Sequence, residues 1–187
     1  MSGRFEVTET PLSGLYVLQR TIRADDRGWL ERMYCETDLA SVLDSRPIVQ
    51  VNRTLTRART TVRGMHYQLP PSAEAKMVSC LRGAAFDVAV DLRRDSPTFL
   101  QWHAEALDAE NRRSLFIPEG FAHGFQALSD ECELLYFHTA AYDADAERGL
   151  HPTEPRVAIE WPLPLEHLSE RDASHPPLAA EFDGIVV

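Results

Sequence analysis

The stretch that decides the fold class is Ala84-Ala85-Phe86-Asp87-Val88-Ala89-Val90-Asp91-Leu92-Arg93, in which side-chain character alternates with a period of two. Successive side chains of a β-strand point to opposite faces, so one face would be apolar and the other would carry alanines and two carboxylates. We expect a strand whose apolar face lies in the core of a sandwich. The carboxylates, Asp87 and Asp91, are expected to be structural, with a functional carboxylate pair as the alternative.

Shorter stretches on either side of this strand also have strand character, and Pro, Gly, Asp and Asn separate them. They are residues 15–18, 29–34, 48–52, 76–81, 102–107, 114–117 and 133–139. Many short strands are typical of a β-sandwich or barrel. One helix is expected at residues 37–43, after a Thr cap and closing one end of the sheets, and a weaker helix signal covers residues 165–169.

Length and proline content predict a single domain, residues 1–187, with an irregular tail. The chain has 187 residues, enough for one well-buried core. Half of the 12 prolines lie in the last quarter, where they disfavour regular sheet. We therefore expect residues 143–187 to wrap around the sheets rather than to pair with them.

The overall charge excludes some classes of partner. Lys and Arg total 19 against 29 Asp and Glu, which gives a net charge of -10 and argues against nucleic-acid or anionic-membrane binding. A small anionic ligand is still compatible with this net charge. The three cysteines form no CxxC pair, and no stretch has the character of a signal peptide or a membrane span, so a cytoplasmic protein is expected.

Two turn-rich segments place a histidine where unusual backbone geometry is needed: Arg63-Gly64-Met65-His66-Tyr67-Gln68 and Pro118-Glu119-Gly120-Phe121-Ala122-His123-Gly124-Phe125. The second has the P-x-G-x-x-H spacing of a cupin barrel. The first resembles the companion cupin metal segment, but the expected ligand positions read His66, Gln68, Lys76 and Gly83. A protonated lysine repels a cation, so we expect a pocket without metal or other cofactor, in which Lys76 faces a developing oxyanion and His66 is free to act as a base.

Several segments together resemble the dTDP-4-dehydrorhamnose 3,5-epimerase family, collinearly from about residue 10 to 178. They are the two histidine segments, Lys76, residues 86–93, Ser96-Pro97-Thr98, Trp161-Pro162, Asp26-Arg27-Gly28 and Leu168-Ser169-Glu170-Arg171-Asp172. The resemblance implies an all-β cupin jelly roll with a few short helices, usually a homodimer. It also implies a metal-independent epimerase of a nucleotide-linked 4-keto-6-deoxy sugar, inverted at C3 and C5 through an enolate.

The resemblance also assigns catalytic roles. His66 would remove the proton at sugar C3 or C5, and Asp172 would orient it, since a carboxylate on one ring nitrogen fixes the tautomer and makes the other nitrogen more basic. Tyr136 would return a proton from the opposite face, and Lys76 would stabilise the C4 enolate.

Nucleotide contacts implied by the family fall on seven residues: Arg27, Gln50, Asn52, Arg63, His123, Glu147 and Arg171. A guanidinium fork suits a pyrophosphate, so a locally cationic pocket is expected despite the global charge. The other five histidines match no chemical spacing and are expected to be surface or packing residues: His103, His138, His151, His167 and His175.

Departures from the family pattern keep alternatives open. Arg32 stands where relatives have Glu, Arg53 where His is common, and Pro152-Thr153-Glu154 where Trp-Asn-Asp is frequent. These positions bear on recognition more than on proton transfer, so an epimerase acting on C3 alone is one alternative. A non-catalytic cupin that binds a sugar nucleotide is another, and a metal-dependent cupin oxygenase is a weaker one.

Overall fold

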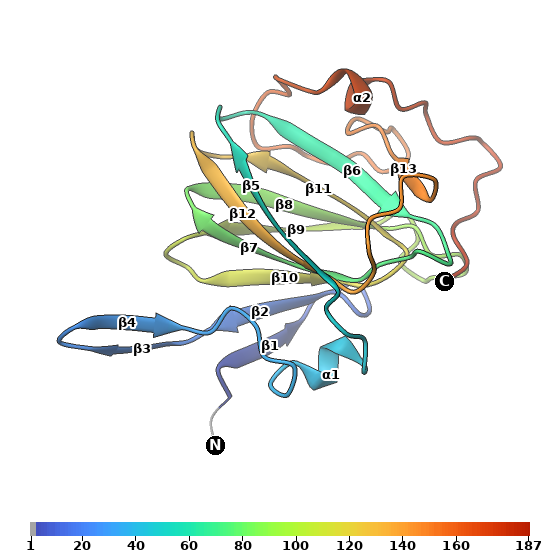
Figure 1. Cartoon of the computed structure of the whole chain (residues 1–187). Coiled ribbons are helices and arrows are strands. Elements are labelled where there is room, and N and C mark those ends of the chain that lie inside the picture. The colour runs from blue at the N-terminus through green and yellow to red at the C-terminus, as the bar shows by residue number, and fades with distance from the viewer. Residues whose placement is uncertain (1–2) are drawn as a thin grey trace.

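Two antiparallel sheets face each other, and a separate hairpin projects from them in the computed structural model, which describes residues 3–187 (Figure 1). In order, the six-stranded sheet contains β1 (Phe5–Glu9), β2 (Tyr16–Arg20), β10 (Arg113–Ile117), β7 (Lys76–Arg82), β12 (Cys132–His138) and β5 (Gln50–Thr56). The five-stranded sheet contains β13 (Glu147–Gly149), β6 (Val62–Gln68), β11 (Phe121–Ala127), β8 (Ala84–Asp91) and β9 (Trp102–Asp108). The hairpin consists of β3 (Ile22–Asp25) and β4 (Gly28–Glu31).

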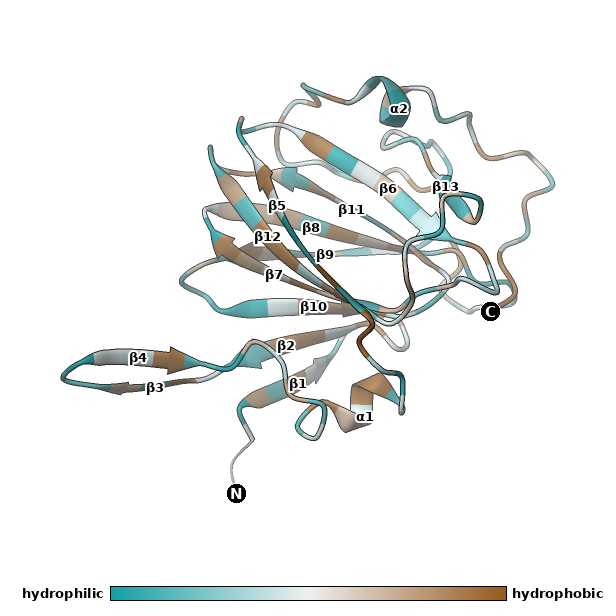
Figure 2. Ribbon diagram, in the orientation of Figure 1, coloured by the Kyte–Doolittle hydropathy of each residue, from teal (hydrophilic) through white to brown (hydrophobic). Residues whose placement is uncertain are grey.

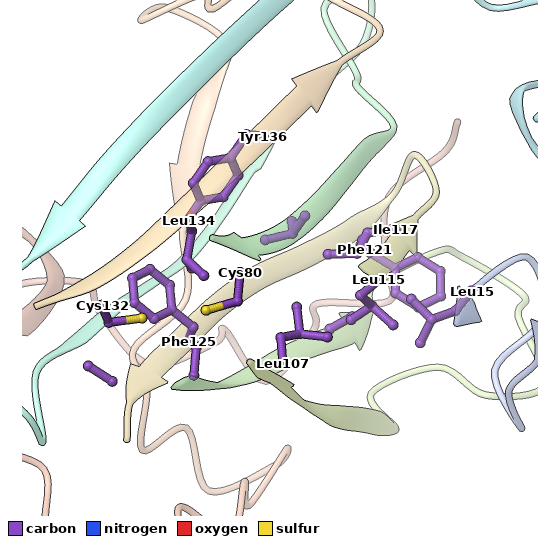
Figure 3. Packing of buried hydrophobic residues seen from close by; sticks show 14 of the residues in the cluster. Leu15, Cys80, Leu107, Leu115, Ile117, Phe121, Phe125, Cys132, Leu134 and Tyr136 are labelled. Carbon is purple, nitrogen blue, oxygen red and sulfur yellow. The ribbon is translucent and has the colours of Figure 1, made fainter. Parts of the chain in front are cut away.

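An apolar core fills the space between the sheets. The six-stranded sheet contributes Leu115 and Leu134, and the five-stranded sheet contributes Leu107 and Phe125, all of them at most 2% exposed. Figure 3 shows part of this packing, with Tyr136 above Leu134 on β12. The expected all-β sandwich is confirmed, and each of the seven short stretches overlaps an observed strand.

Strand β8 is buried on both faces, and its orientation is opposite to the one expected. Val88 and Val90 lie on the outer face, in a cluster with tail residues. Ala85, Ala89 and Asp87 lie on the inner side, the alanines in the core between the sheets and Asp87 bonded to a buried histidine. A tail that covers the outer face lets the larger side chains lie there and leaves the small ones for the interior.

The tail covers the outer face of the five-stranded sheet (Figure 1). Val157, Trp161, Leu178 and Ile185 pack against that sheet. The tail was expected not to pair, but its start forms the short strand β13 along β6. This segment precedes Pro152, so its backbone N–H groups are available for pairing.

Both helices are a single turn and differ from the expected ranges. Helix α1 (Ala40–Leu43) starts after Leu39 rather than at a Thr cap, and it packs on the outer face of the six-stranded sheet instead of closing an end. Helix α2 (Glu170–Ala173) lies just beyond residues 165–169, because the Ser169 hydroxyl accepts a hydrogen bond from the Asp172 N–H at 3.0 Å and caps it. In residues 3–187, no helix has the length and apolar character needed to cross a membrane.

Candidate active site

The two histidine segments form neighbouring strands rather than turns. His66 on β6 lies opposite His123 on β11, and Figure 2 shows hydrophilic residues interspersed with hydrophobic ones along β6. Both histidines line a cavity of about 250 Å³ between the sheets.

Two glycines allow β6 and β11 to approach each other beside the histidines. A β-bulge interrupts their pairing between His123 and Phe125. A Cβ added at Gly64 would lie 2.5 Å from the Gly124 Cα, and one added at Gly124 would lie 2.7 Å from the Arg63 carbonyl oxygen. Gly124 has no left-handed φ, so its requirement is steric. The bulge and the two glycines together set the positions of both histidines.

Replacing Gly124 should therefore disturb both the fold and the cavity. We expect Gly124→Ala to lower the free energy of unfolding by about 1–3 kcal/mol, the usual result of overpacking. Chemical denaturation would measure this change, and catalytic turnover should fall with it. An unchanged denaturation midpoint together with full activity would show that the contact relaxes without cost.

His66 and Asp172 form a hydrogen-bonded pair at one wall of the cavity. The His66 Nε2 lies 2.7 Å from Asp172 Oδ1, and the Gly64 N–H donates to Asp172 Oδ2 at 3.3 Å. Burial alone would raise the pKa of Asp172, but these hydrogen bonds and the nearby imidazole lower it below its ordinary value. The carboxylate thus stays ionised and can fix the orientation of the imidazole.

Tyr136 lies across the cavity from His66, because β12 belongs to the opposite sheet. Burial, with the charge of Asp87 as the second cause, raises the pKa of Tyr136 far above its ordinary value. Its ring lies edge-on to His123, with 6.0 Å between ring centroids, and stacks on His138 at 5.9 Å. The phenol therefore stays neutral and keeps the proton that a general acid would donate.

Lys76 reaches the same cavity from the start of β7, and it is already paired. Its Nζ lies 2.6 Å from Glu74 Oε1, and both side chains are about nine-tenths buried. The second carboxylate oxygen of Glu74 lies 2.8 Å from His138 Nδ1. Glu74 was not among the expected site residues.

Of the seven residues expected to contact the nucleotide, five line the cavity: Gln50, Asn52, Arg63, His123 and Glu147. Arg171 is bound to one of them, since its Nη2 lies 2.5 Å from Glu147 Oε2. The lining is therefore balanced in charge rather than strongly cationic, with Arg63 and Lys76 against Glu74 and Glu147.

The structure does not bring Arg27 to this cavity. It lies at the turn of the β3–β4 hairpin, which projects away from the sandwich (Figure 1). Its side chain is 89% exposed and is paired with Asp25 at 2.5 Å. Trp29 and Leu30 on β4 are also more than half exposed.

Two more residues, Asp87 and His138, lie near the cavity although no role there was expected from the sequence. The Asp87 Oδ1 lies 2.8 Å from His123 Nε2, in a second buried histidine–carboxylate pair. His138 was expected to be a surface or packing residue, yet it lines the cavity beside Glu74. The available signal was alternation along β12, which places His138 on the same face as Tyr136. By contrast, Asp91 is structural as expected, since it binds Arg93, Ser96 and Thr98.

The residues at the cupin metal positions all have other partners. The Gln68 amide donates to the Ser72 and Ala141 carbonyls and accepts from the Asp143 N–H. Among residues 3–187, one His and carboxylate cluster could hold an ion: His66, Asp172 and His175, with ligand atoms within 4.8 Å of one another. The same cluster contains the His66–Asp172 hydrogen bond, which an ion would have to displace.

The departures from the family pattern lie outside the cavity lining. Arg32 is paired with Asp38 at 2.8 Å, and Arg53 is paired with Glu133 on the face of β5 that points away from the cavity. The Pro152 carbonyl accepts from Trp161 Nε1 at 2.9 Å and helps to fix the tail. Within residues 3–187, none of these residues lines the cavity.

Comparisons with known proteins agree with this geometry. A family model described as dTDP-4-dehydrorhamnose 3,5-epimerase matches residues 9–180. The chain is 42% identical over 174 residues to a dTDP-4-dehydrorhamnose 3,5-epimerase of Streptomyces griseus, covering 90% of this chain and 86% of the relative. It is 40% identical over 163 residues to a dTDP-4-dehydrorhamnose 3-epimerase of Streptomyces niveus, covering 86% of this chain and 78% of the relative.

A solved structure extends the agreement to the fold. It is a dTDP-6-deoxy-D-glucose-3,5-epimerase of Legionella pneumophila in complex with dTDP-4-keto-L-rhamnose. The TM-score is 0.90 at 34% identity, and the match covers 98% of this chain and 99% of the other. The expected cupin fold is thereby confirmed.

Proposed function

The chain belongs to the dTDP-4-dehydrorhamnose 3,5-epimerase family and is an epimerase of dTDP-4-keto-6-deoxy sugars, and from this premise we propose how its cavity inverts C3 and C5. The observation that carries the proposal is the arrangement of two side chains on opposite sheets. His66, bonded to Asp172, and Tyr136 line one cavity from its two walls. A sugar ring between them would present one face to a base and the other to an acid.

Each inversion proceeds in two proton transfers. His66 donates its Nε2 proton to Asp172 in a hydrogen bond, which leaves the lone pair of Nδ1 to remove the proton next to the C4 carbonyl. The C–H electron pair forms the C3–C4 or C4–C5 double bond, and the carbonyl pair moves to oxygen, which accepts a hydrogen bond from the Lys76 ammonium. The Tyr136 hydroxyl then protonates the same carbon from the opposite face, and solvent restores both side chains. These steps use no metal or other cofactor.

Recognition of the nucleotide is assigned to the polar residues around the cavity. Arg63, Gln50, Asn52 and His123 line it, and the Glu147–Arg171 pair lies at its margin. Arg63 is exposed at the cavity and can pair with a diphosphate oxygen. The three free cysteines fit a reducing compartment, and we place the reaction in the cytoplasm.

We propose that the chain forms a homodimer, in which Arg27 serves the cavity of the second copy rather than its own. The hairpin carries Arg27 away from its own cavity and exposes Trp29 and Leu30, which suits a segment that lies against another subunit. Light scattering at varied concentration should report a dimer for the wild type. A monomer that is fully active would contradict this assignment.

The reaction is tested by hydrogen exchange in deuterated water. With a dTDP-4-keto-6-deoxy sugar at saturation, we expect NMR to show deuterium at both C3 and C5 of the product. Label at C3 alone would favour the mono-epimerase alternative, which the Streptomyces niveus relative supports. Absence of label at both carbons, with the ligand bound, would favour the non-catalytic alternative.

A further inference from the structure

Four side chains form a connected row on the six-stranded-sheet wall of the cavity, and two of them, Glu74 and His138, have no role assigned above. Glu74 is at its centre, with Lys76 Nζ at 2.6 Å and His138 Nδ1 at 2.8 Å on its two oxygens. His138 Nε2 lies 3.4 Å from Asn52 Nδ2. The side chains of Glu74, Lys76 and His138 are each at most 10% exposed.

The hydrogen-bond directions in this row follow from the partners. Asn52 Nδ2 can only donate, so His138 Nε2 accepts, and the proton of the neutral imidazole is on Nδ1, where it is donated to Glu74. The ring of His138 is held in place by stacking on Tyr136 at 16° between planes. One oxygen of Glu74 is thereby fixed, and the other is left for Lys76.

Glu74 remains ionised in this setting. Burial alone would raise its pKa, but the hydrogen bond from His138 and the charge of Lys76 lower it to about 2. The pairing with Glu74 fixes the position of the Lys76 Nζ, which a long lysine side chain does not do by itself.

We propose that Glu74, oriented by His138 and Asn52, is a positioning residue that holds the Lys76 ammonium in place for the enolate. This inference rests on the proposed function of the cavity. The carboxylate does not touch the sugar. It acts by keeping a proton donor fixed at the place where the C4 oxygen becomes negative.

The test compares Glu74→Gln, which keeps the shape but removes the charge, with Glu105→Gln as a matched control. Glu105 is also a mostly buried carboxylate between a histidine and a cation, His103 at 3.0 Å and Arg113 at 3.2 Å, but it lies away from the cavity. We expect Glu74→Gln to lower kcat by about 10-fold to 100-fold with KM changed by less than about 3-fold. Glu105→Gln should retain the wild-type values.

The conservative variant separates positioning from general damage. Glu74→Asp keeps a carboxylate that can hold the Lys76 Nζ, so it should recover part of the kcat that Glu74→Gln loses, with KM again unchanged.

The outcomes also separate this inference from the proposed function. Deuterium exchange by the wild type, together with kcat and KM values for Glu74→Gln equal to those of Glu105→Gln, would overturn the inference and leave the proposed function intact. If Glu74→Gln does not fold, His138→Phe decides the matter, because it keeps the stacking on Tyr136 and removes the bond that orients Glu74. It should lower kcat with KM unchanged, and full activity would overturn the inference.

Discussion

Replacement of His66 by asparagine should abolish deuterium exchange at C3 and C5 together. Loss of a general base lowers proton transfer by about 10²–10⁴-fold. Asparagine can still donate to Asp172, so the buried carboxylate keeps a partner and the fold should survive. Exchange measured by NMR, with dTDP binding as a separate readout, would show lost chemistry with retained affinity.

His103→Asn is the matched control for this variant. His103 is also bonded to a carboxylate, Glu105, at 3.0 Å, but it lies on β9 away from the cavity. Exchange that persists at one carbon in His66→Asn would contradict a single base. The buried His123–Asp87 pair, directly opposite His66 on β11, would then be the second base to test.

The fold class could be predicted from the sequence because alternation is a local property. Residues 84–93 show it clearly, and β8 covers nearly all of them. The orientation of that strand could not be predicted in the same way. It depends on Val157, Trp161 and Ile185, which lie far along the chain and cover the outer face of the sheet. Local periodicity shows that two faces differ, and only tertiary packing decides which face is inside.

The candidate site could be predicted in part for a similar reason. His66, Tyr136 and Lys76 stand in recognisable segments, and the structure places them around one cavity. Glu74 and His138 are 64 positions apart and acquire their relation only through the pairing of β7 with β12. A lone histidine in a strand gives no sign of the carboxylate that it will meet.

Removal of the Tyr136 hydroxyl should separate exchange from inversion. In Tyr136→Phe, His66 and Lys76 remain, so the enolate still forms. The only acid left at the carbon is the protonated His66, which returns a proton to the face from which one was removed. Deuterium should then enter with retained configuration, while inverted product falls by about 10²–10⁴-fold.

The same variant tests whether the two walls of the cavity have different roles. Phenylalanine fills the space of Tyr136 and keeps the ring contacts with His123 and His138, so a loss of inversion is not explained by packing. Tyr34→Phe is the control, since Tyr34 stacks on Phe137, which faces away from the cavity on the same strand. Equal losses of exchange and inversion in Tyr136→Phe would contradict the assignment of this hydroxyl as the acid. They would place it instead with the groups that stabilise the enolate, because an acid that acts only after the enolate has formed cannot limit the removal of the first proton.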